Sequence, residues 1–352
     1  MVIDLSFYKG KRVFITGHTG FKGSWLCKIL LKAGAIVTGY SLAPFAKPNL
    51  YELINIHSSI LSIIGDIRNF SSLKKIIEIT KPEIVFHMAA QPIVRTSYEN
   101  PMYTYETNVL GTVNILESIR LTDSVKSFVN ITTDKVYENK EFIWGYRENE
   151  NLCGLDPYSN SKSCSELVTY SYRESFFKKQ NTAAISTARS GNVIGGGDFA
   201  KDRIIPDCIR AVRNKKDILV RNENSIRPYQ HVLDCLSGYL ILATKQYEDK
   251  SLFQGSYNFG PNEGNYITTG DLVRLFCKSW GNIDFISKKD DGPHEASFLK
   301  LDCSKAKAVL NWYPRWGIQT ALEKVVEFTK LFLNNEDVDA CIDKQINEYF
   351  NI

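Results

Sequence analysis

The sequence predicts an α/β protein built on a doubly wound parallel sheet, with a smaller α/β lobe toward the C-terminus. Two observations favour this class. Through the first half of the chain, short β-branched runs alternate with segments of helical periodicity, and glycines cluster directly after the first run. We expect a first domain over residues 1–190 and a second lobe over residues 191–352, with some segments of the second part returning to the first domain.

The first half begins with a strand over residues 12–16, and each later strand is separated from the next by a helical segment. Strands that alternate with helices in this way are parallel, because each crossover returns the chain to the same edge of the sheet. The further strands are expected in IVTGY (36–40), ILSIIGDI (60–67), PEIVFHMAA (82–90) and SVKSFVNITT (124–133), and the helices in SWLCKILLKAGA (24–35), SSLKKIIEIT (71–80) and a long segment ending near Arg120.

The second half continues with a strand over residues 182–190 and a glycine-rich loop over 190–198, too long for a simple turn. A strand at 257–262 and helices within 268–281 and 299–329 are expected to form the smaller lobe. The tail after Leu333 is polar, and we expect no chemistry from it.

Charge and composition argue against nucleic acid, a membrane or a metal ion as a partner. The net charge is only +4, and basic residues are interspersed with acidic ones, so nucleic acid is not an expected partner. Apolar runs stop short of the roughly 18 residues that a membrane span needs, and the first residues lack a leader pattern, so we expect a cytoplasmic protein with no membrane partner. The eight cysteines include no CxxC pair, which favours reduced structural thiols and no metal site.

The glycines Gly17, Gly20 and Gly23 lie between the first strand and the first helix. Glycines at this junction let the backbone approach a pyrophosphate at a helix N-terminus, as in the Rossmann-type dinucleotide site. The carboxylate that usually binds the adenosine ribose is missing after the second strand, so the residues do not settle the choice between NAD and NADP. Asp66, after the third strand, is a candidate acceptor for the adenine amine, although an Asp in a turn is more often a cap.

Tyr158 and Lys162 form the next candidate pair. Asp156 and Pro157 are an N-cap and a first helical residue, which places Tyr158 in the first turn of a helix and Lys162 one turn further on the same face. A nearby ammonium and the positive end of a helix dipole both favour a phenolate. We therefore predict that Tyr158 acts as a general base.

Several motifs together resemble the extended short-chain dehydrogenase/reductase superfamily, which works on nucleotide sugars: the three glycines, HMAAQ (87–91), TNVLGT (107–112), Thr133 and Tyr158xxxLys162. Longer strings resemble the family of CDP-glucose 4,6-dehydratases within it, and the resemblance as a whole runs from about residue 8 to about residue 317. These strings are GHTGFKGSWL, AAQPIVR, TTDKVYEN, WGYRENE, DPYSNSK, SGNVIGGGDFA and RPYQHVLD.

The resemblance implies a chemistry for each candidate. A tightly held NAD would take a hydride from C4 of CDP-glucose while Tyr158 accepts the O4 proton, Thr133 bonds O4 and Lys162 holds the ribose. Water would then leave from C6, with Asp134 as the acid and Lys135 as the base, before hydride returns to C6 in deoxysugar synthesis for surface polysaccharides such as O-antigen. The acid must then be protonated and the amine neutral in the reactive state. A surface ion pair in a turn is the alternative interpretation of these two residues.

The resemblance also implies binding residues and an assembly. We expect a homodimer formed through segments 97–120 and 157–178. His231 is interpreted as a core histidine, and His294-Glu295 is expected near the nucleotide end of the site. The expected cofactor contacts are Gly17, Thr19, Gly20, Phe21, Lys22, Gly23, Asp66, Ile67, Ala89, Ala90, Gln91, Asn108, Tyr158 and Lys162, and the expected substrate contacts are Arg95, Asn192, Arg203 and Arg227.

Two alternatives stay open from the residues. A sugar 4-epimerase would share the fold, the cofactor and Tyr158xxxLys162, but it has no use for an acid and base at residues 134 and 135. A non-catalytic NAD(P)-binding sensor would share only the fold, and such proteins commonly lose the tyrosine or the lysine, both of which are present here.

Overall fold

The computed structural model describes residues 4–281, 283–287 and 298–352. Its centre is a seven-stranded sheet of order β11-β6-β5-β4-β1-β2-β3, in which all the neighbouring strands are parallel. The order reverses on the two sides of β1, which makes the sheet doubly wound as predicted. The strands are β1 (Arg12–Thr16), β2 (Ile36–Ser41), β3 (Leu61–Ile64), β4 (Ile84–His87), β5 (Ser127–Ile131), β6 (Ala184–Arg189) and β11 (Ser256–Asn258).

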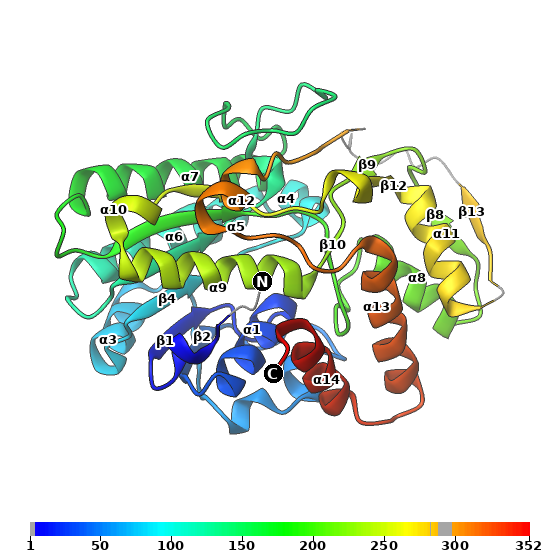
Figure 1. The fold of residues 1–352 in the computed structure, drawn as a ribbon, viewed down its shortest axis with the longest axis horizontal. Helices are drawn as coiled ribbons and strands as arrows, with labels where there is room; N and C mark the ends of the chain where they lie inside the picture. The colour runs from blue at the N-terminus through cyan, green and yellow to red at the C-terminus, as the bar shows by residue number, and fades with distance from the viewer. Residues whose placement is uncertain (1–3, 282, 288–297) are drawn as a thin grey trace.

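Helices cover both faces of the sheet (Figure 1). One layer contains α3 (Phe70–Thr80), α6 (Gly111–Arg120) and α7 (Pro157–Phe176), and the other contains α1 (Phe21–Lys32) and α9 (Val232–Glu248). Because both faces are covered, β4, β5 and β6 are buried along their whole length. Shorter helices are η1 (Ser6–Tyr8), α2 (Leu50–Leu53), η2 (Ile56–Ser58), η4 (Asp134–Val136) and η5 (Glu263–Asn265).

The long helix expected before Arg120 is instead four consecutive pieces. Pro101 lacks a backbone N–H, and a new helix begins at this residue. A π-helical turn then precedes the last piece. The pieces are α4 (Val94–Glu99), α5 (Pro101–Tyr105), η3 (Glu106–Leu110) and α6.

A smaller lobe lies at the right of Figure 1 and has its own apolar core, which includes Cys208, Leu272, Phe276 and Leu322. It combines α8 (Ile204–Arg213), α11 (Thr269–Trp280) and α13 (Ile318–Leu333) with three two-stranded ladders. The ladders pair β8 (Ile218–Val220) with β13 (Phe285–Ser287), β9 (Ile226–Arg227) with β12 (Ile267–Thr268), and β7 (Val193–Ile194) with β10 (Gln230–His231).

Several segments after residue 231 belong to the larger lobe. The strand expected at 257–262 is β11, which joins the large sheet beside β6, so its assignment to the smaller lobe was wrong. The same holds for α12 (Ser304–Leu310), which packs on α9 and β11. Together with α10 (Lys250–Phe253), α9 and α12 extend the layer that also holds α1.

The polar tail forms a further helix, α14 (Val338–Phe350), that packs against α1. Lys28 on α1 pairs with Asp339 at 2.6 Å, and Lys32 pairs with Asp343 at 3.1 Å. Tyr349 and Phe350 are fully buried, so the end of the chain is part of the main core.

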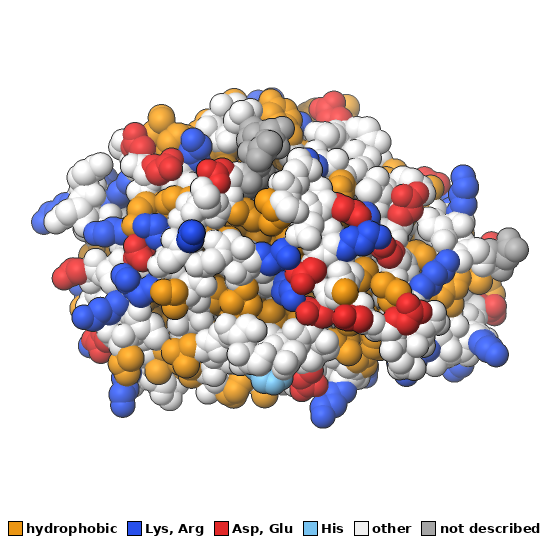
Figure 2. Space-filling model, turned by 60° about the horizontal axis from the view of Figure 1, so that its bottom comes forward, with side chains coloured by type: hydrophobic (Ala, Val, Ile, Leu, Met, Phe, Trp, Pro, Cys, Tyr) orange, Lys and Arg blue, Asp and Glu red, His pale blue; other side chains and the backbone are white. Residues whose placement is uncertain are grey.

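Acidic and basic side chains are interspersed over the face shown in Figure 2. In the ranges that the structure describes, no helix is both long and apolar enough to cross a bilayer, and no group of three or more His, Cys, Asp or Glu residues could hold a metal ion. Six of the eight cysteines are buried, whereas Cys153 is exposed and Cys164 is partly exposed. His294 and Glu295 lie outside the described residues.

Candidate active site

The glycine loop brings the ends of β1 and β4 into contact with the start of α1. Gly17 has φ +77°, and a Cβ there would lie 2.8 Å from the backbone N of Ala89. A Cβ on Gly23 would overlap the carbonyl of Gly17. Only glycine fits these two positions, because the loop packs tightly against the backbone that follows β4 and against its own first residues.

Thr19 and Lys22 extend this loop on two sides. The Thr19 hydroxyl donates to the carbonyl of Leu42 at 2.9 Å and lies 2.9 Å from the Ser41 hydroxyl, which ties the loop to the end of β2. Burial lowers the pKa of Lys22, whose ammonium lies 5.9 Å from the centre of the Tyr239 ring. The protein around Lys22 therefore disfavours its charged form, although the residue is partly exposed beside the loop.

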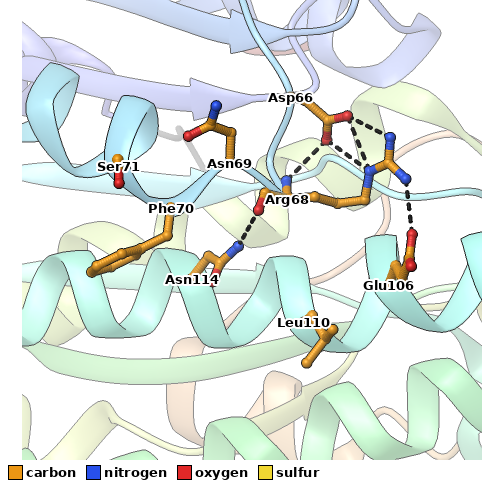
Figure 3. Close-up of a pocket in the computed structure, with 8 residues that line it drawn as sticks. All are labelled: Asp66, Arg68, Asn69, Phe70, Ser71, Glu106, Leu110 and Asn114. Atoms are coloured by element: carbon orange, nitrogen blue, oxygen red, sulfur yellow. Dashed lines mark hydrogen bonds and ion pairs between the residues drawn. The ribbon is translucent and has the colours of Figure 1, made fainter.

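Asp66 is already paired within the protein (Figure 3). Its carboxylate accepts from Arg68 at 2.7 Å, and this hydrogen bond is the main cause that lowers its pKa. Arg68 in turn donates to Glu106 at 2.9 Å. An adenine amine would therefore have to share the Asp66 carboxylate with Arg68. The neighbouring Ile67, also a predicted cofactor contact, is buried against Gly111.

Asn108 holds the end of β4 to α7. Its side chain accepts from the backbone N–H of Gln91 at 2.8 Å and donates to the Gln91 carbonyl at 3.1 Å and to the Ser161 hydroxyl at 2.9 Å. With three hydrogen bonds to two residues, the side chain fixes Gln91 against α7, a role that sequence reasoning did not give it.

Thr133, Asp134 and Lys135 lie directly after β5. The Thr133 hydroxyl caps η4 and donates to Asp134 Oδ1 at 2.9 Å. Asp134 is only 1% exposed, and its Oδ2 has no hydrogen-bond partner in the described part of the chain. Lys135 is partly exposed. A buried carboxyl and a more accessible amine are thus next to each other at the sheet edge.

Tyr158 lies in the first turn of α7, which Asp156 caps as predicted. Burial raises the pKa of Tyr158 to about 12, and a hydrogen bond to Thr133 opposes this effect. The expectation of a lowered pKa was therefore wrong for the protein alone, because burial outweighs the hydrogen bond with Thr133 and the charge of Arg203.

Lys162 is buried one turn later and donates to the carbonyl of Ile131 at 3.0 Å. Burial, and then the charge of Lys22, lower its pKa to about 7. Lys162 therefore titrates near neutral pH in the protein alone, and an electron-rich partner would favour its charged form.

A buried ion pair holds the segment that follows β5 in place. Glu166 on α7 and Arg189 at the end of β6 are each 2% exposed and 2.9 Å apart. Glu166 also accepts from Thr132 at 2.5 Å, and Arg189 donates to the Tyr137 hydroxyl at 2.8 Å. The ion pair thus holds the residues on both sides of segment 133–136. The residues that form and contact it are too far apart in the sequence for a local pattern to predict the pair.

The second glycine-rich loop packs into the body of the protein. Cβ atoms on Gly195, Gly196 and Gly197 would clash with side chains of Val232, Phe328 and Leu50 respectively. These glycines serve packing, and the partly exposed Asn192 with φ +46° remains the position open to a substrate.

The predicted arginines lie in ion pairs or in the interior. Arg203 pairs with Asp198 at 2.9 Å, and Arg95 contacts Asp202 at 3.8 Å. Arg227 is 6% exposed in β9. His231 is fully buried between Trp25 and Trp316, and burial lowers its pKa to about 3, as expected for a core histidine.

The residues present fit a nicotinamide dinucleotide. The loop after β1 is packed at Gly17 against the backbone that follows β4, and the N-cap of α1, Gly20, supplies no side chain that would cap the helix, so the first N–H groups of α1 can bind a phosphate. The buried Lys162 lies near Lys22. Phe21 and Lys22 begin α1, so the loop, the helix N-terminus and two ammonium groups converge.

Comparison with known proteins places the chain in a family. Residues 14–325 match the family model described as GDP-mannose 4,6 dehydratase. The chain belongs to this dehydratase family. A CDP-glucose 4,6-dehydratase of Salmonella typhimurium is 48% identical over 99% of both chains, and a CDP-paratose 2-epimerase of Salmonella typhi is 26% identical over 90% of this chain and 99% of its own.

Solved structures agree with the fold of this dehydratase-family chain. A UDP-glucuronic acid 4-epimerase from Bacillus cereus superposes with a TM-score of 0.79 at 24% identity, covering 91% of this chain and 99% of the other. A dTDP-glucose 4,6-dehydratase from Bacillus anthracis, in complex with NAD, gives a TM-score of 0.75 at 20% identity, covering 90% and 96%. The predicted fold class and the predicted family resemblance are confirmed.

Proposed function

We propose that this dehydratase-family chain converts CDP-glucose to CDP-4-keto-6-deoxyglucose and water. The observation that carries the proposal is the succession Thr133-Asp134-Lys135 at the end of β5, beside Tyr158 on α7, in a chain 48% identical to a CDP-glucose 4,6-dehydratase. An elimination needs one group that gives a proton and one that takes a proton, and this pair supplies both.

The first half of the reaction uses Thr133 and Tyr158. NAD, when bound, supplies the acceptor and later the donor of a hydride. Thr133 orients the sugar O4, and Tyr158 takes its proton. The phenol must ionise to do so; the hydrogen bond with Thr133 and the charge of Arg203 favour that ionisation against the effect of burial, and a bound nicotinamide cation would add to them.

The second half uses Asp134 and Lys135. The C4 ketone acidifies the C5 hydrogen, which Lys135 removes as a neutral amine. Asp134, as a carboxylic acid, gives its proton to the departing C6 hydroxyl. The contact from Thr133 to Asp134 Oδ1 leaves Oδ2 as the oxygen that can carry and release this proton.

Binding of the substrate diphosphate is proposed for Arg95, Arg203 and Arg227, whose guanidinium groups match phosphate oxygens, and for Asn192, whose amide can donate to them. Arg203 lies close enough to Tyr158 to affect its pKa, which supports a diphosphate next to the reacting sugar. The cytidine base is proposed from the 48% identical relative. The free thiols fit a reducing compartment, and we propose the cytoplasm.

The proposed substrate is tested by turnover of CDP-, dTDP-, GDP- and UDP-glucose, with product masses measured. We expect the highest kcat/KM for CDP-glucose, with a product lighter by one water. A hexose isomer of unchanged mass would identify a 4-epimerase, and NAD binding without turnover of any of the four sugars would favour a sensor.

A further inference from the structure

Gly191 follows β6 at the same sheet edge at which Asp134 follows β5. The two strands are parallel neighbours, so their carboxyl ends lie side by side. Gly191 is buried, and its φ lies outside the left-handed region that favours glycine. The backbone at residue 191 is therefore one that alanine could adopt, and the reason for glycine must lie in the space around it.

That space is filled by the carboxyl group of Asp134. A Cβ at residue 191 would overlap Cγ, Oδ1 and Oδ2 of Asp134, with Oδ2 the most severely affected. Oδ1 accepts from Thr133 at 2.9 Å, while Oδ2 is buried without a hydrogen-bond partner among the described residues. The carboxyl therefore occupies the volume that any other residue at 191 would fill.

The loop has little freedom to move away. Before Gly191, the Arg189 carbonyl accepts from the Phe259 N–H at 2.8 Å, and the Ser190 hydroxyl bonds the Tyr239 hydroxyl. After it, the Asn192 carbonyl accepts from the Gln230 N–H at 3.3 Å. A clash at residue 191 would thus be relieved by displacing Asp134.

We propose that Gly191 is a positioning residue for the elimination step, because its missing side chain lets the Asp134 carboxyl lie where it can protonate the departing hydroxyl. The inference rests on the proposed function. It predicts that bulk at residue 191 slows loss of water and leaves oxidation at C4 intact.

The test compares Gly191→Ala with the wild type in a single turnover of CDP-glucose by the NAD-loaded enzyme. We expect NADH absorbance to rise at the normal rate and then persist, while the rate of water loss falls about 10²-fold or more, as for loss of a general acid. Equal slowing of NADH formation and water loss would overturn the proposal, as would a normal rate of water loss.

Gly260→Ala is the matched control. Gly260 follows β11, the other neighbour of β6, and a Cβ there would make ordinary contacts at 3.4 to 3.6 Å with Cys303 and Leu301. It should leave both rates unchanged. A Gly260→Ala enzyme with the same persistent NADH would contradict an effect specific to residue 191.

Asp134→Ala links the two residues. If Gly191→Ala acts through Asp134, it should add no further loss of rate in the Asp134→Ala enzyme, whereas additive losses would contradict the proposal.

If Gly191→Ala does not fold, Asp134→Ala should restore folding by removing the clash, and a double variant that also stays unfolded would overturn the proposal. A wild type that dehydrates none of the four NDP-glucoses would refute the proposed function instead.

Discussion

At the residue scale, Lys162 is a buried cation whose position costs stability. Its pKa falls from 10.5 to about 7 on folding, so between these values the unfolded chain binds a proton that the folded chain does not. The free energy of unfolding therefore rises with pH across this window, by an amount on the order of a few kcal/mol.

Lys162→Met should reveal this cost in the protein without cofactor. We expect the variant to be more stable than the wild type near pH 7, with the difference shrinking toward pH 10. Urea unfolding at several pH values measures it. Parallel pH profiles for the two proteins would show that Lys162 is not the group responsible.

Lys135 separates elimination from oxidation. Lys135→Ala removes the proposed base but keeps Thr133 and Tyr158, so NADH should still form from CDP-glucose while water release falls about 10²-fold or more. Stopped-flow absorbance and product mass follow the two steps. Full dehydration by this variant would remove Lys135 from the mechanism.

At the scale of elements, the ion pair Glu166–Arg189 joins α7 to β6. Strand β6 is the neighbour of β5, after which the proposed acid and base follow. Removing one partner leaves the other charge buried, so Glu166→Gln should lower the free energy of unfolding by about 3 to 5 kcal/mol. Glu78→Gln breaks the exposed Lys74–Glu78 pair and should cost about 0 to 1 kcal/mol. Urea unfolding compares them, and equal losses would contradict a structural role for the buried pair.

Elements with local signals were predicted well. The bounds of β1 and the Asp156 cap of α7 match the expectation, because a β-branched run and a capping side chain act within a few residues. The sheet position of β11 and the burial of α14 were missed, because both depend on partners more than 60 residues away in the chain: Thr187 for Ser256 and Lys28 for Asp339.

The candidate site likewise contains features that a local sequence motif indicates and features that no motif indicates. Thr133, Tyr158 and the first glycines were singled out because each has a motif with a chemical reason, and the structure places them after β5, in the first turn of α7 and before α1. The fit of Gly191 to Asp134 could not be predicted, because it arises where two strands meet and leaves no sequence pattern. The pKa of Tyr158 was misjudged for a similar reason, since burial is a property of the folded chain.

At the scale of the whole molecule, we propose that two chains pair through α5 and α7. Met102 on α5 is 75% exposed and Tyr170 on α7 is 57% exposed, and the same helices and η3 expose Leu167 and Leu110. Exposed apolar residues on adjacent helices are typical of an interface.

Met102→Asp with Tyr170→Asp should therefore give a monomer in analytical ultracentrifugation, because two charges would be buried in the interface. Phe45→Asp, at a residue 84% exposed after β2, is the control and should leave the assembly unchanged. A wild type that sediments as a monomer would contradict the proposed dimer.

The proposed reaction uses residues of both lobes together with the cofactor. One measurement tests it most directly. The protein is incubated with CDP-glucose in deuterated water, and the product is analysed by mass spectrometry. Lys135 would exchange the proton taken from C5 with solvent, and C5 would be protonated from that solvent-exchanged pool as hydride adds to C6. The product should therefore have lost one water and gained one deuterium, at C5. A product that has lost water without gaining deuterium, or a hexose isomer of unchanged mass, would contradict elimination by Asp134 and Lys135.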